Sequence, residues 1–185
     1  MNSPTNQQPL QPLEIATGLT ALVSSDGGFW LDLEVYQRWV RAAADVLAAS
    51  AEGPLLATAP QLVFVAETSP RALCCPQCGA LMQKYRLASH HPARVDRCVP
   101  CNGVWMDAAE WAALQQDGCT YRLLQIIGDA GQREIREAEA RQRQQASYIE
   151  RFGADDYARL QQTRDWLAAH PHRTELLAFL QKPAD

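Results

Sequence analysis

Residues 75–107 read CPQCGALMQKYRLASHHPARVDRCVPCNGVWMD, and they decide how the rest of the chain is interpreted. The stretch contains two C-x2-C pairs, Cys75 with Cys78 and Cys98 with Cys101, separated by 19 residues. Two pairs at about this separation are typical of a zinc site with four thiolate ligands. Zn²⁺ takes four ligands in a tetrahedron at Zn–S distances of ~2.3 Å, and a tight turn aims both sulfurs of a pair at one point. The spacing therefore predicts one structural Zn²⁺ bound by these four cysteines.

The residues around each pair support this prediction. Gly79 follows the first pair and Asn102 follows the second, and both residue types tolerate the positive φ angle that such a turn requires. Residues 81–97 are long enough for a β-hairpin that brings the two turns together. One C-x2-C pair alone would be compatible with a redox dithiol, but two pairs with turn residues favour zinc. Four thiolates leave no open coordination position, so a catalytic zinc is not expected.

The remaining cysteines and the nearby histidines are interpreted differently. Cys74 directly precedes the first ligand, and its use in place of Cys75 would break the C-x2-C spacing. We therefore expect Cys74 to be a bystander or a spare thiol. Cys119 has no partner pattern and is expected to be a small core residue. His90 and His91 fall near the predicted hairpin tip, where a surface role is expected because the four cysteines complete the metal shell.

The segment after the second pair predicts a short helix. Asp107 is followed three residues later by Glu110, which is a capping-box arrangement with Asp in place of Ser or Thr. We expect the helix to span residues 108–116. Trp105 and Trp111 supply apolar bulk that a small metal-binding unit otherwise lacks, and we expect both in the core.

These residues resemble a bacterial zinc-ribbon family that is named for its likeness to the zinc ribbon of transcription factor IIB. The family pattern is Cys-Pro-x-Cys-Gly, a hairpin, and Cys-x-x-Cys-Gly-Gly-x-Trp-Leu-Asp with a Glu soon after. It stands here as CPQCGALM, VDRCVPCNGVWMD and Glu110. The resemblance covers residues 75–114 and departs at Asn102, where the family usually has Gly. It implies a zinc-binding ribbon, whereas a name based on shape does not imply DNA binding.

An earlier segment repeats the end of this motif. Residues 28–32, GFWLD, match residues 103–107, GVWMD, at an offset of 75. Val23 and Asp26 stand at the positions of the second cysteine pair, so the metal ligands are missing. One interpretation is a degenerate, metal-free ribbon, which we would expect to stay folded after metal removal. The other is chance similarity between two strand-to-helix junctions, where Gly and Asp are common.

The expected fold is α+β, in which a small zinc-ribbon β-hairpin unit follows an N-terminal hairpin-helix unit and precedes an α-helical C-terminal region. A helical pattern covers residues 32–51, and residues 62–66 are typical of a short buried strand. Residues 132–151 are rich in Arg, Glu and Gln and form i,i+4 charge pairs. The predicted divisions are 1–12, a disordered tail; 13–70, the hairpin-helix unit; 71–118, the zinc ribbon with its helix; and 119–185, the helical region.

The composition narrows the class of protein. The chain has 185 residues, 47% hydrophobic residues and a net charge of −4, which excludes a wholly disordered chain and is not typical of a domain that binds nucleic acid by charge alone. The sequence contains no nucleotide-binding Gly-rich loop, nucleophile elbow or His-Glu-x-x-His motif, so we expect a non-enzymatic protein. No targeting segment or apolar run of membrane-spanning length is visible, which predicts a cytoplasmic location, where clustered cysteines favour a metal.

The predicted hairpin is also the densest basic stretch. It carries Lys84, Arg86, Arg94 and Arg97, opposed only by Asp96. We expect this patch to contact a protein partner, because four thiolates around Zn²⁺ add a charge of −2 and leave only weak, salt-sensitive binding to nucleic acid. The sequence leaves three alternatives open: neutralisation of the patch by the acidic N-terminal unit, a nucleic-acid-binding transcription factor, and a redox sensor whose thiols oxidise and release zinc.

Overall fold

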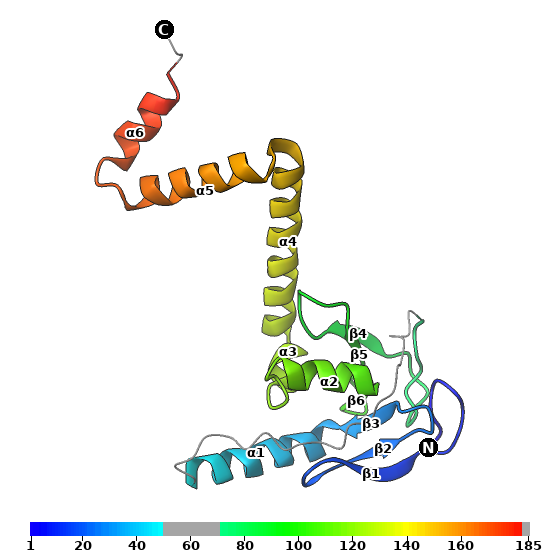
Figure 1. The fold of residues 1–185 in the computed structure, drawn as a ribbon. Coiled ribbons are helices and arrows are strands. Elements are labelled where there is room, and N and C mark those ends of the chain that lie inside the picture. Colours follow the sequence, from blue (N-terminus) through cyan, green and yellow to red (C-terminus); the bar gives the residue numbers. More distant parts are fainter. Residues whose placement is uncertain (50–70, 183–185) are drawn as a thin grey trace. The chain divides into compact units, whose positions relative to one another are not determined.

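The computed structural model describes residues 1–49 and 71–182, which form parts of two compact units (Figure 1). The first unit, Met1–Arg136, contains the β-sheet, and the second, Glu137–Asp185, is helical. The strand predicted at residues 62–66 lies outside the described residues. Helices occur together with an antiparallel sheet, so the predicted α+β class is confirmed at this level.

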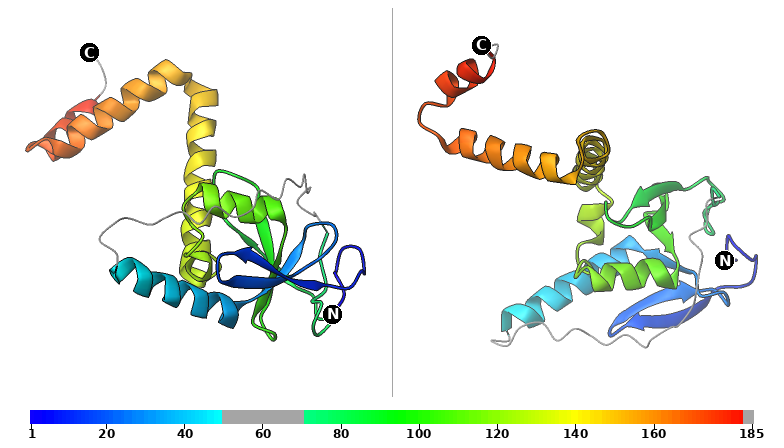
Figure 2. Two further views of the ribbon diagram at one scale, coloured as in Figure 1. Left: turned by 60° about the horizontal axis from the view of Figure 1, so that its bottom comes forward. Right: turned by 45° about the horizontal axis from the view of Figure 1, so that its top comes forward.

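Within the described residues, six strands form one antiparallel sheet in the order β1-β2-β3-β6-β5-β4 (Figure 2). The first three strands come from the N-terminal segment and the last three from the cysteine-rich segment, and the pairing of β3 with β6 joins the two halves. The strands are β1 (Gln11–Ala16), β2 (Leu19–Val23), β3 (Phe29–Asp32), β4 (Gln83–Arg86), β5 (Arg94–Cys98) and β6 (Gly103–Met106).

The two faces of the central strand pair carry different side chains. Phe29 and Leu31 on β3 point into the larger core, which the helices cover. Trp30 pairs directly with Trp105 on β6, and both indoles face the opposite side, in the apolar cluster that contains cysteines. Strand side chains alternate between faces, so one strand pair serves both clusters.

Gly28 and Gly103 make room for the two indoles. A Cβ atom at Gly103 would overlap Cζ2 of Trp30 and lie 2.7 Å from its Cε2. A Cβ atom at Gly28 would overlap Cζ2 of Trp105 in the same way. The glycine of each Gly-x-Trp segment therefore makes room for the tryptophan of the other. This reciprocal packing gives a reason why the GFWLD and GVWMD segments are similar.

The start of the chain differs from the expectation of a disordered tail at residues 1–12. The Ser3 N–H donates to Gln8 O (2.8 Å), and the Gln7 N–H donates to Ser3 O (3.0 Å). Side chains then tie this turn to the loop after β2: Thr5 Oγ1 donates to Asp26 Oδ2 at 2.6 Å. The composition predicted disorder because these residues supply few apolar groups, whereas the structure orders them through polar contacts.

Two junctions of the same kind lead from strand to helix. Asp32 ends β3, and its Oδ1 accepts from the N–H groups of Glu34 (2.7 Å) and Val35 (3.1 Å) at the start of α1 (Leu33–Ala49). Asp107 follows β6 and forms the predicted capping box with Glu110 at the start of α2 (Ala108–Gln116). The helix expected at 108–116 is thus confirmed with its cap.

The helices cover one face of the sheet with a shared core. Tyr36 of α1 is fully buried, and its hydroxyl donates to Thr120 O (2.8 Å) and accepts from Leu123 N–H (3.0 Å). Leu123 begins the short helix α3 (Leu123–Ile126). The predicted division after residue 118 therefore does not coincide with a unit boundary, because residues beyond it pack into the core of the sheet.

The second unit contains helices that bury little apolar surface. It comprises the later part of α4 (Asp129–Phe152), α5 (Ala154–Ala169) and α6 (Arg173–Leu180). Two of the expected i,i+4 pairs are present, Glu137 with Arg141 and Glu139 with Arg143. In the described part of the chain, no helix combines the length and apolar character that crossing a membrane requires.

Candidate metal centre

The four cysteines of the predicted site meet at one point. Cys75 and Cys78 lie in the loop that leads to β4, Cys98 ends β5, and Cys101 lies in the turn between β5 and β6. Their Sγ atoms all lie within 4.8 Å of one another, and those of Cys78 and Cys98 are 3.6 Å apart. Sulfurs around a tetrahedral ion at ~2.3 Å would be separated by about 3.8 Å, so the cluster has the dimensions to hold a metal ion.

All six cysteines belong to the described residues, and each is a free thiol rather than part of a disulfide. A disulfide would require an S–S distance of ~2.05 Å, far shorter than the observed 3.6 Å. The four thiols are therefore not joined by a disulfide, and they lie close enough together to share a metal ion.

The turns have the backbone geometry that the sequence predicts. Gly79 has a φ of 74° and Asn102 a φ of 48°, both in the left-handed region. In the first turn, the Gly79 N–H donates to Cys75 O (2.9 Å), and the Gln77 N–H points at Cys75 Sγ (3.4 Å). Such N–H groups offset negative charge on a thiolate.

Without a bound ion, the thiols influence one another's pKa values. A hydrogen bond from the Ala80 N–H, helped by Cys101, lowers the pKa of Cys78 to about 7. The hydrogen bond with Cys78 raises the pKa of Cys101 to about 12. Burial raises the pKa of Cys98. Without an ion, one of the thiols therefore loses its proton readily, and its negative charge opposes the ionisation of the others. A bound cation would offset this repulsion and allow all four cysteines to be thiolates.

An apolar surround covers one side of the cluster. Cys75 and Cys98 are buried, at 3% and 1% exposure, beside Trp30 and Trp105. Cys78 is exposed and Cys101 half-buried, so the centre reaches the surface on its other side.

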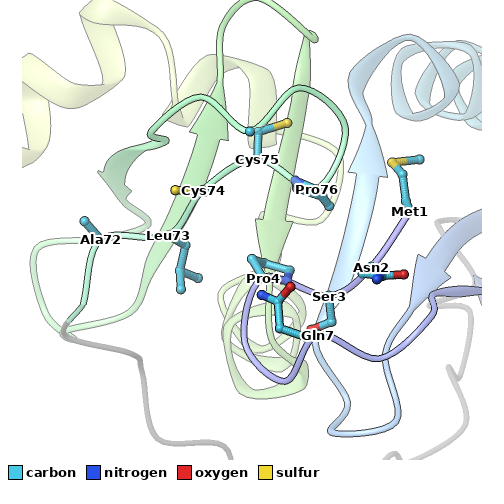
Figure 3. Close-up of a pocket in the computed structure, with 11 residues that line it drawn as sticks. Met1, Asn2, Ser3, Pro4, Gln7, Ala72, Leu73, Cys74, Cys75 and Pro76 are labelled. Atoms are coloured by element: carbon cyan, nitrogen blue, oxygen red, sulfur yellow. The ribbon is translucent and has the colours of Figure 1, made fainter.

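A cavity of about 640 Å³ opens next to this centre, between the loop at residues 72–79 and the N-terminal turn (Figure 3). Cys74 lines it and is exposed, and its backbone forms a bridge with Leu81. Of these two neighbouring cysteines, which both line the cavity (Figure 3), only Cys75 contributes its sulfur to the four-cysteine group. The placement of Cys74 outside the four-sulfur group agrees with the prediction that it is a bystander.

The basic hairpin residues lie on β4 and β5 and are all half-buried. Lys84 Nζ lies 2.8 Å from Asp96 Oδ2, and the Asp96 side chain is only 6% exposed. Arg97 donates to Ile127 O (3.3 Å) and stacks over Tyr85. Part of the basic charge is thus used inside the unit, where Lys84 pairs with Asp96 of the same hairpin.

Glu110 is the most perturbed carboxyl group near these strands. Burial, followed by repulsion from Asp107, raises the pKa of Glu110 to about 8. The unfolded chain ionises this group near 4.5, so the folded state holds an additional proton between pH 4.5 and 8. Wild-type stability should therefore fall as the pH rises through this window.

Replacing Glu110 with Gln should remove this pH dependence. Gln retains the reciprocal capping bond but carries no charge in either state. We expect Glu110→Gln to gain stability relative to the wild type as the pH rises from 5 to 9, by on the order of 3 kcal/mol at the upper end. Urea unfolding of zinc-saturated protein at several pH values measures this difference. Glu34→Gln, at an exposed helix position, is the control and should show no such trend.

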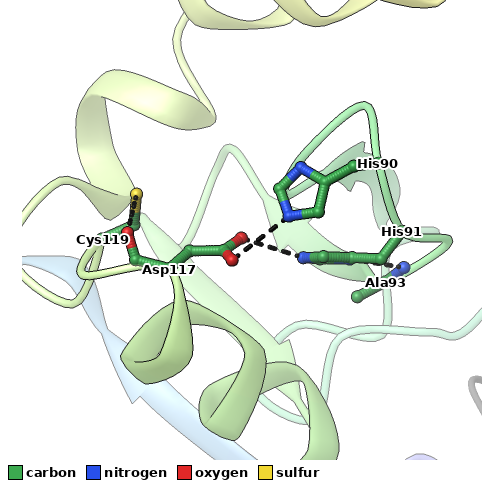
Figure 4. A network of polar contacts seen from close by, with 5 residues as sticks. All are labelled: His90, His91, Ala93, Asp117 and Cys119. Carbon is green, nitrogen blue, oxygen red and sulfur yellow. Dashed lines mark hydrogen bonds and ion pairs between the residues drawn. The ribbon is translucent and has the colours of Figure 1, made fainter.

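The structure brings together a second group that the sequence analysis missed. His90 and His91, expected to have only a surface role, both lie 3.2 Å from the carboxylate of Asp117 (Figure 4). Among the described residues, this trio and the four cysteines are the two groups whose spacing suits a metal ion. Its members have no fixed spacing in the sequence, because they meet only when the hairpin packs beside the end of α2.

Comparisons with known proteins give no information on the cysteine centre. No family model matches the chain, and neither a curated protein nor a solved structure matches it.

Proposed function

We propose that the protein binds one structural Zn²⁺ through Cys75, Cys78, Cys98 and Cys101, and that residues 71–118 form a zinc ribbon. The observation that carries this proposal is the meeting of four Sγ atoms within 4.8 Å of one another. Two facts favour zinc over other ions: an all-sulfur site selects zinc or iron, and short C-x2-C turns are typical of structural zinc. Membership of the transcription factor IIB-like zinc-ribbon family is part of the same proposal.

The N-terminal half of the sheet is then a metal-free counterpart of the ribbon. The bonds Ser3 N–H to Gln8 O and Gln7 N–H to Ser3 O correspond to Cys75 N–H to Ala80 O and Gly79 N–H to Cys75 O. Gln7 has a φ of 61°, at the position where the metal turn has Gly79.

In this counterpart, hydrogen bonds between two loops take the place of a metal ion. Ser24 Oγ lies 3.3 Å from Asn6 Oδ1, and Asn6 Nδ2 donates to Ser25 Oγ at 3.1 Å. Together with the Thr5–Asp26 bond, these contacts join two loops that a metal ion joins in the other half. The correspondence supports a degenerate repeat over chance similarity.

We propose a non-enzymatic role in which the protein acts by contacting other proteins. A closed four-thiolate shell offers no position for a substrate. The helices of the second unit expose large apolar side chains, including Trp166 at 55%, Phe179 at 69% and Leu180 at 60%. Large exposed apolar side chains are candidates for contacts with other proteins.

The basic hairpin is the proposed contact surface for an acidic partner. Arg86 and Arg94 lie at paired positions on β4 and β5, beside Lys84 and Arg97. Lys84, Arg86 and Arg97 also have contacts within the unit, so we assign recognition to the basic hairpin residues together. A partner that presents carboxylates would gain from bidentate contacts with these guanidinium groups.

Charge reversal at the hairpin tests this proposal. We expect Arg86→Glu with Arg94→Glu to retain one zinc but to lose about tenfold or more of the affinity for its protein partner, because attraction becomes repulsion. The measurement is a pull-down from the native cell followed by titration of the recovered partner. Arg38→Glu with Arg41→Glu reverses two exposed charges on α1 and should leave partner binding unchanged.

The same variants distinguish the other functions. DNA titration at two salt concentrations should give only non-specific binding, with dissociation constants of about 10⁻⁴ to 10⁻⁶ M. Tight DNA binding that the hairpin variant abolishes would support the transcription alternative instead. Zinc release by mild oxidant, lost in Cys74→Ser, would support the redox alternative, for which the exposed Cys74 next to the centre is the relevant feature.

A further inference from the structure

His90, His91 and Asp117 form a compact polar group at the tip of the basic hairpin. His90 Nε2 lies 3.2 Å from Asp117 Oδ1, and His91 Nε2 lies 3.2 Å from Oδ2 of the same carboxylate (Figure 4). One ligand atom from each of the three side chains lies within 4.8 Å of the others. Both imidazoles thus present the same nitrogen toward a single point beside the carboxylate.

We propose that these three side chains form a second metal site, which binds an exchangeable divalent transition-metal ion such as Zn²⁺ or Ni²⁺. Imidazole suits zinc and nickel, and a carboxylate completes a common three-ligand set. Ligand atoms at ~2.1 Å from a tetrahedral ion lie about 3.4 Å apart, close to the two observed distances of 3.2 Å. Small side-chain rotations would therefore place the ion among them.

The electrostatics around Asp117 favour a cation. Asp117 is the C-cap of α2, where the helix dipole is negative and an acidic side chain is unfavourable unless a positive charge lies nearby. Burial acts to raise the pKa of Asp117, but hydrogen bonds from His90 and His91 outweigh it and lower the pKa. The carboxylate therefore stays charged. A metal ion at this point would be attracted both by the negative charge of Asp117 and by the negative end of the α2 helix dipole.

The group borders a cavity that leaves room for a further ligand. This cavity has a volume of about 420 Å³, and His90, Asp117 and Cys119 line one part of it. Arg122 and Glu134 line another part. Three protein ligands leave one tetrahedral position open, which water or a small ligand in the cavity would occupy. The second site thus differs from the closed four-cysteine centre in having an open position.

The hydrogen bonds of the ion-free state explain why this site would bind a metal ion more weakly than the four-cysteine centre. His91 Nδ1 accepts a hydrogen bond from the Ala93 N–H at 3.3 Å, so the neutral ring carries its proton on Nε2 and donates it to Asp117. Metal binding at Nε2 moves that proton to Nδ1 and breaks the bond to Ala93. The site also lies at the surface, with His90 60% exposed, so ions can exchange there.

Titration of zinc-loaded protein with Ni²⁺ tests the site without disturbing the cysteine centre. We expect one equivalent of Ni²⁺ to bind in calorimetry, with paramagnetic broadening of NMR signals confined to residues near His90, His91 and Asp117. His90→Ala with His91→Ala should weaken binding by about 100-fold, and Asp117→Asn, which preserves the side-chain shape, by at least about tenfold. Each variant should still contain one zinc by elemental analysis.

The control is His170→Ala with His172→Ala, which removes the two histidines near the end of α5 and should leave Ni²⁺ binding unchanged. Equal Ni²⁺ affinity in the wild type and in His90→Ala with His91→Ala would overturn the proposed second site. A loss of the tightly bound zinc in those variants would also overturn the assignment of two separate sites. Failure of the cysteine centre itself would instead appear as zinc-free wild-type protein, so the two proposals fail in different ways.

Discussion

Cys78→Ser with Cys101→Ser should abolish tight zinc binding and unfold the whole of the first unit. Structural zinc contributes about 10–16 kcal/mol in zinc-finger peptides, which is as large as the total stability of a typical domain. The two substitutions remove one ligand from each turn, so the turns are no longer held together. Elemental analysis measures the zinc, and hydrogen exchange with mass spectrometry measures protection in each strand.

The expected loss extends to β1, β2 and β3, although they contain no ligand. The sequence analysis predicted that the N-terminal hairpin-helix unit would stay folded without metal, because it lacks metal ligands. In the structure, β3 pairs with β6 over four residue pairs, and both halves share one core. Retained protection in Phe29–Asp32 after zinc loss would restore the original expectation of two independent units.

Cys74→Ser and Cys119→Ser are the matched controls. Cys74 is exposed outside the four-sulfur group, and Cys119 packs at the edge of the main core. Both variants should keep one zinc and nearly wild-type protection. A zinc loss in Cys74→Ser on the scale of the double ligand variant would mean that the ligand set has been assigned incorrectly.

The features predicted from sequence are those in which chemistry acts over a few residues. Metal ligands must lie close together, so C-x2-C spacing and turn residues at Gly79 and Asn102 specify local geometry. The capping box of Asp107 and Glu110 is equally local, since side chain and backbone are three residues apart. These predictions needed no knowledge of the remaining chain.

The features that were missed depend on distant segments. Asp117 reaches His90 and His91 only because α2 packs beside the hairpin, and no spacing rule links them. The turn at Ser3–Gln7 escaped notice because its Ser, Thr and Asn side chains suggested disorder, whereas their partners lie about 20 residues away in the loop after β2. The repeated Gly-x-Trp segments indicated that the two halves of the sheet are similar, but they did not predict that β3 and β6 pair directly with each other.

Gly103→Ala should destabilise the first unit severely, because the methyl group has no space. It would overlap the Trp30 indole, which is 3% exposed and packs in the apolar cluster beside the cysteines. The φ angle of Gly103 is not in the left-handed region, so the cost is steric overlap alone. We expect a loss of about 3 kcal/mol in the free energy of unfolding, as for other overpacked cores. Urea unfolding followed by circular dichroism measures it.

Two further variants separate overlap from general loss of glycine. Gly118→Ala places its methyl group in open space at a φ of 63°, so it should cost only the ~1 kcal/mol of an unfavourable backbone conformation. Trp30→Leu removes the ring atoms that the new methyl group would meet. If overlap is the cause, Gly103→Ala combined with Trp30→Leu should lose less stability than the sum of the single variants, by about 1 kcal/mol or more. Strict additivity would show that Gly103 acts through the backbone of β6, and the paired Gly-x-Trp segments would then not explain how the two halves of the sheet are joined.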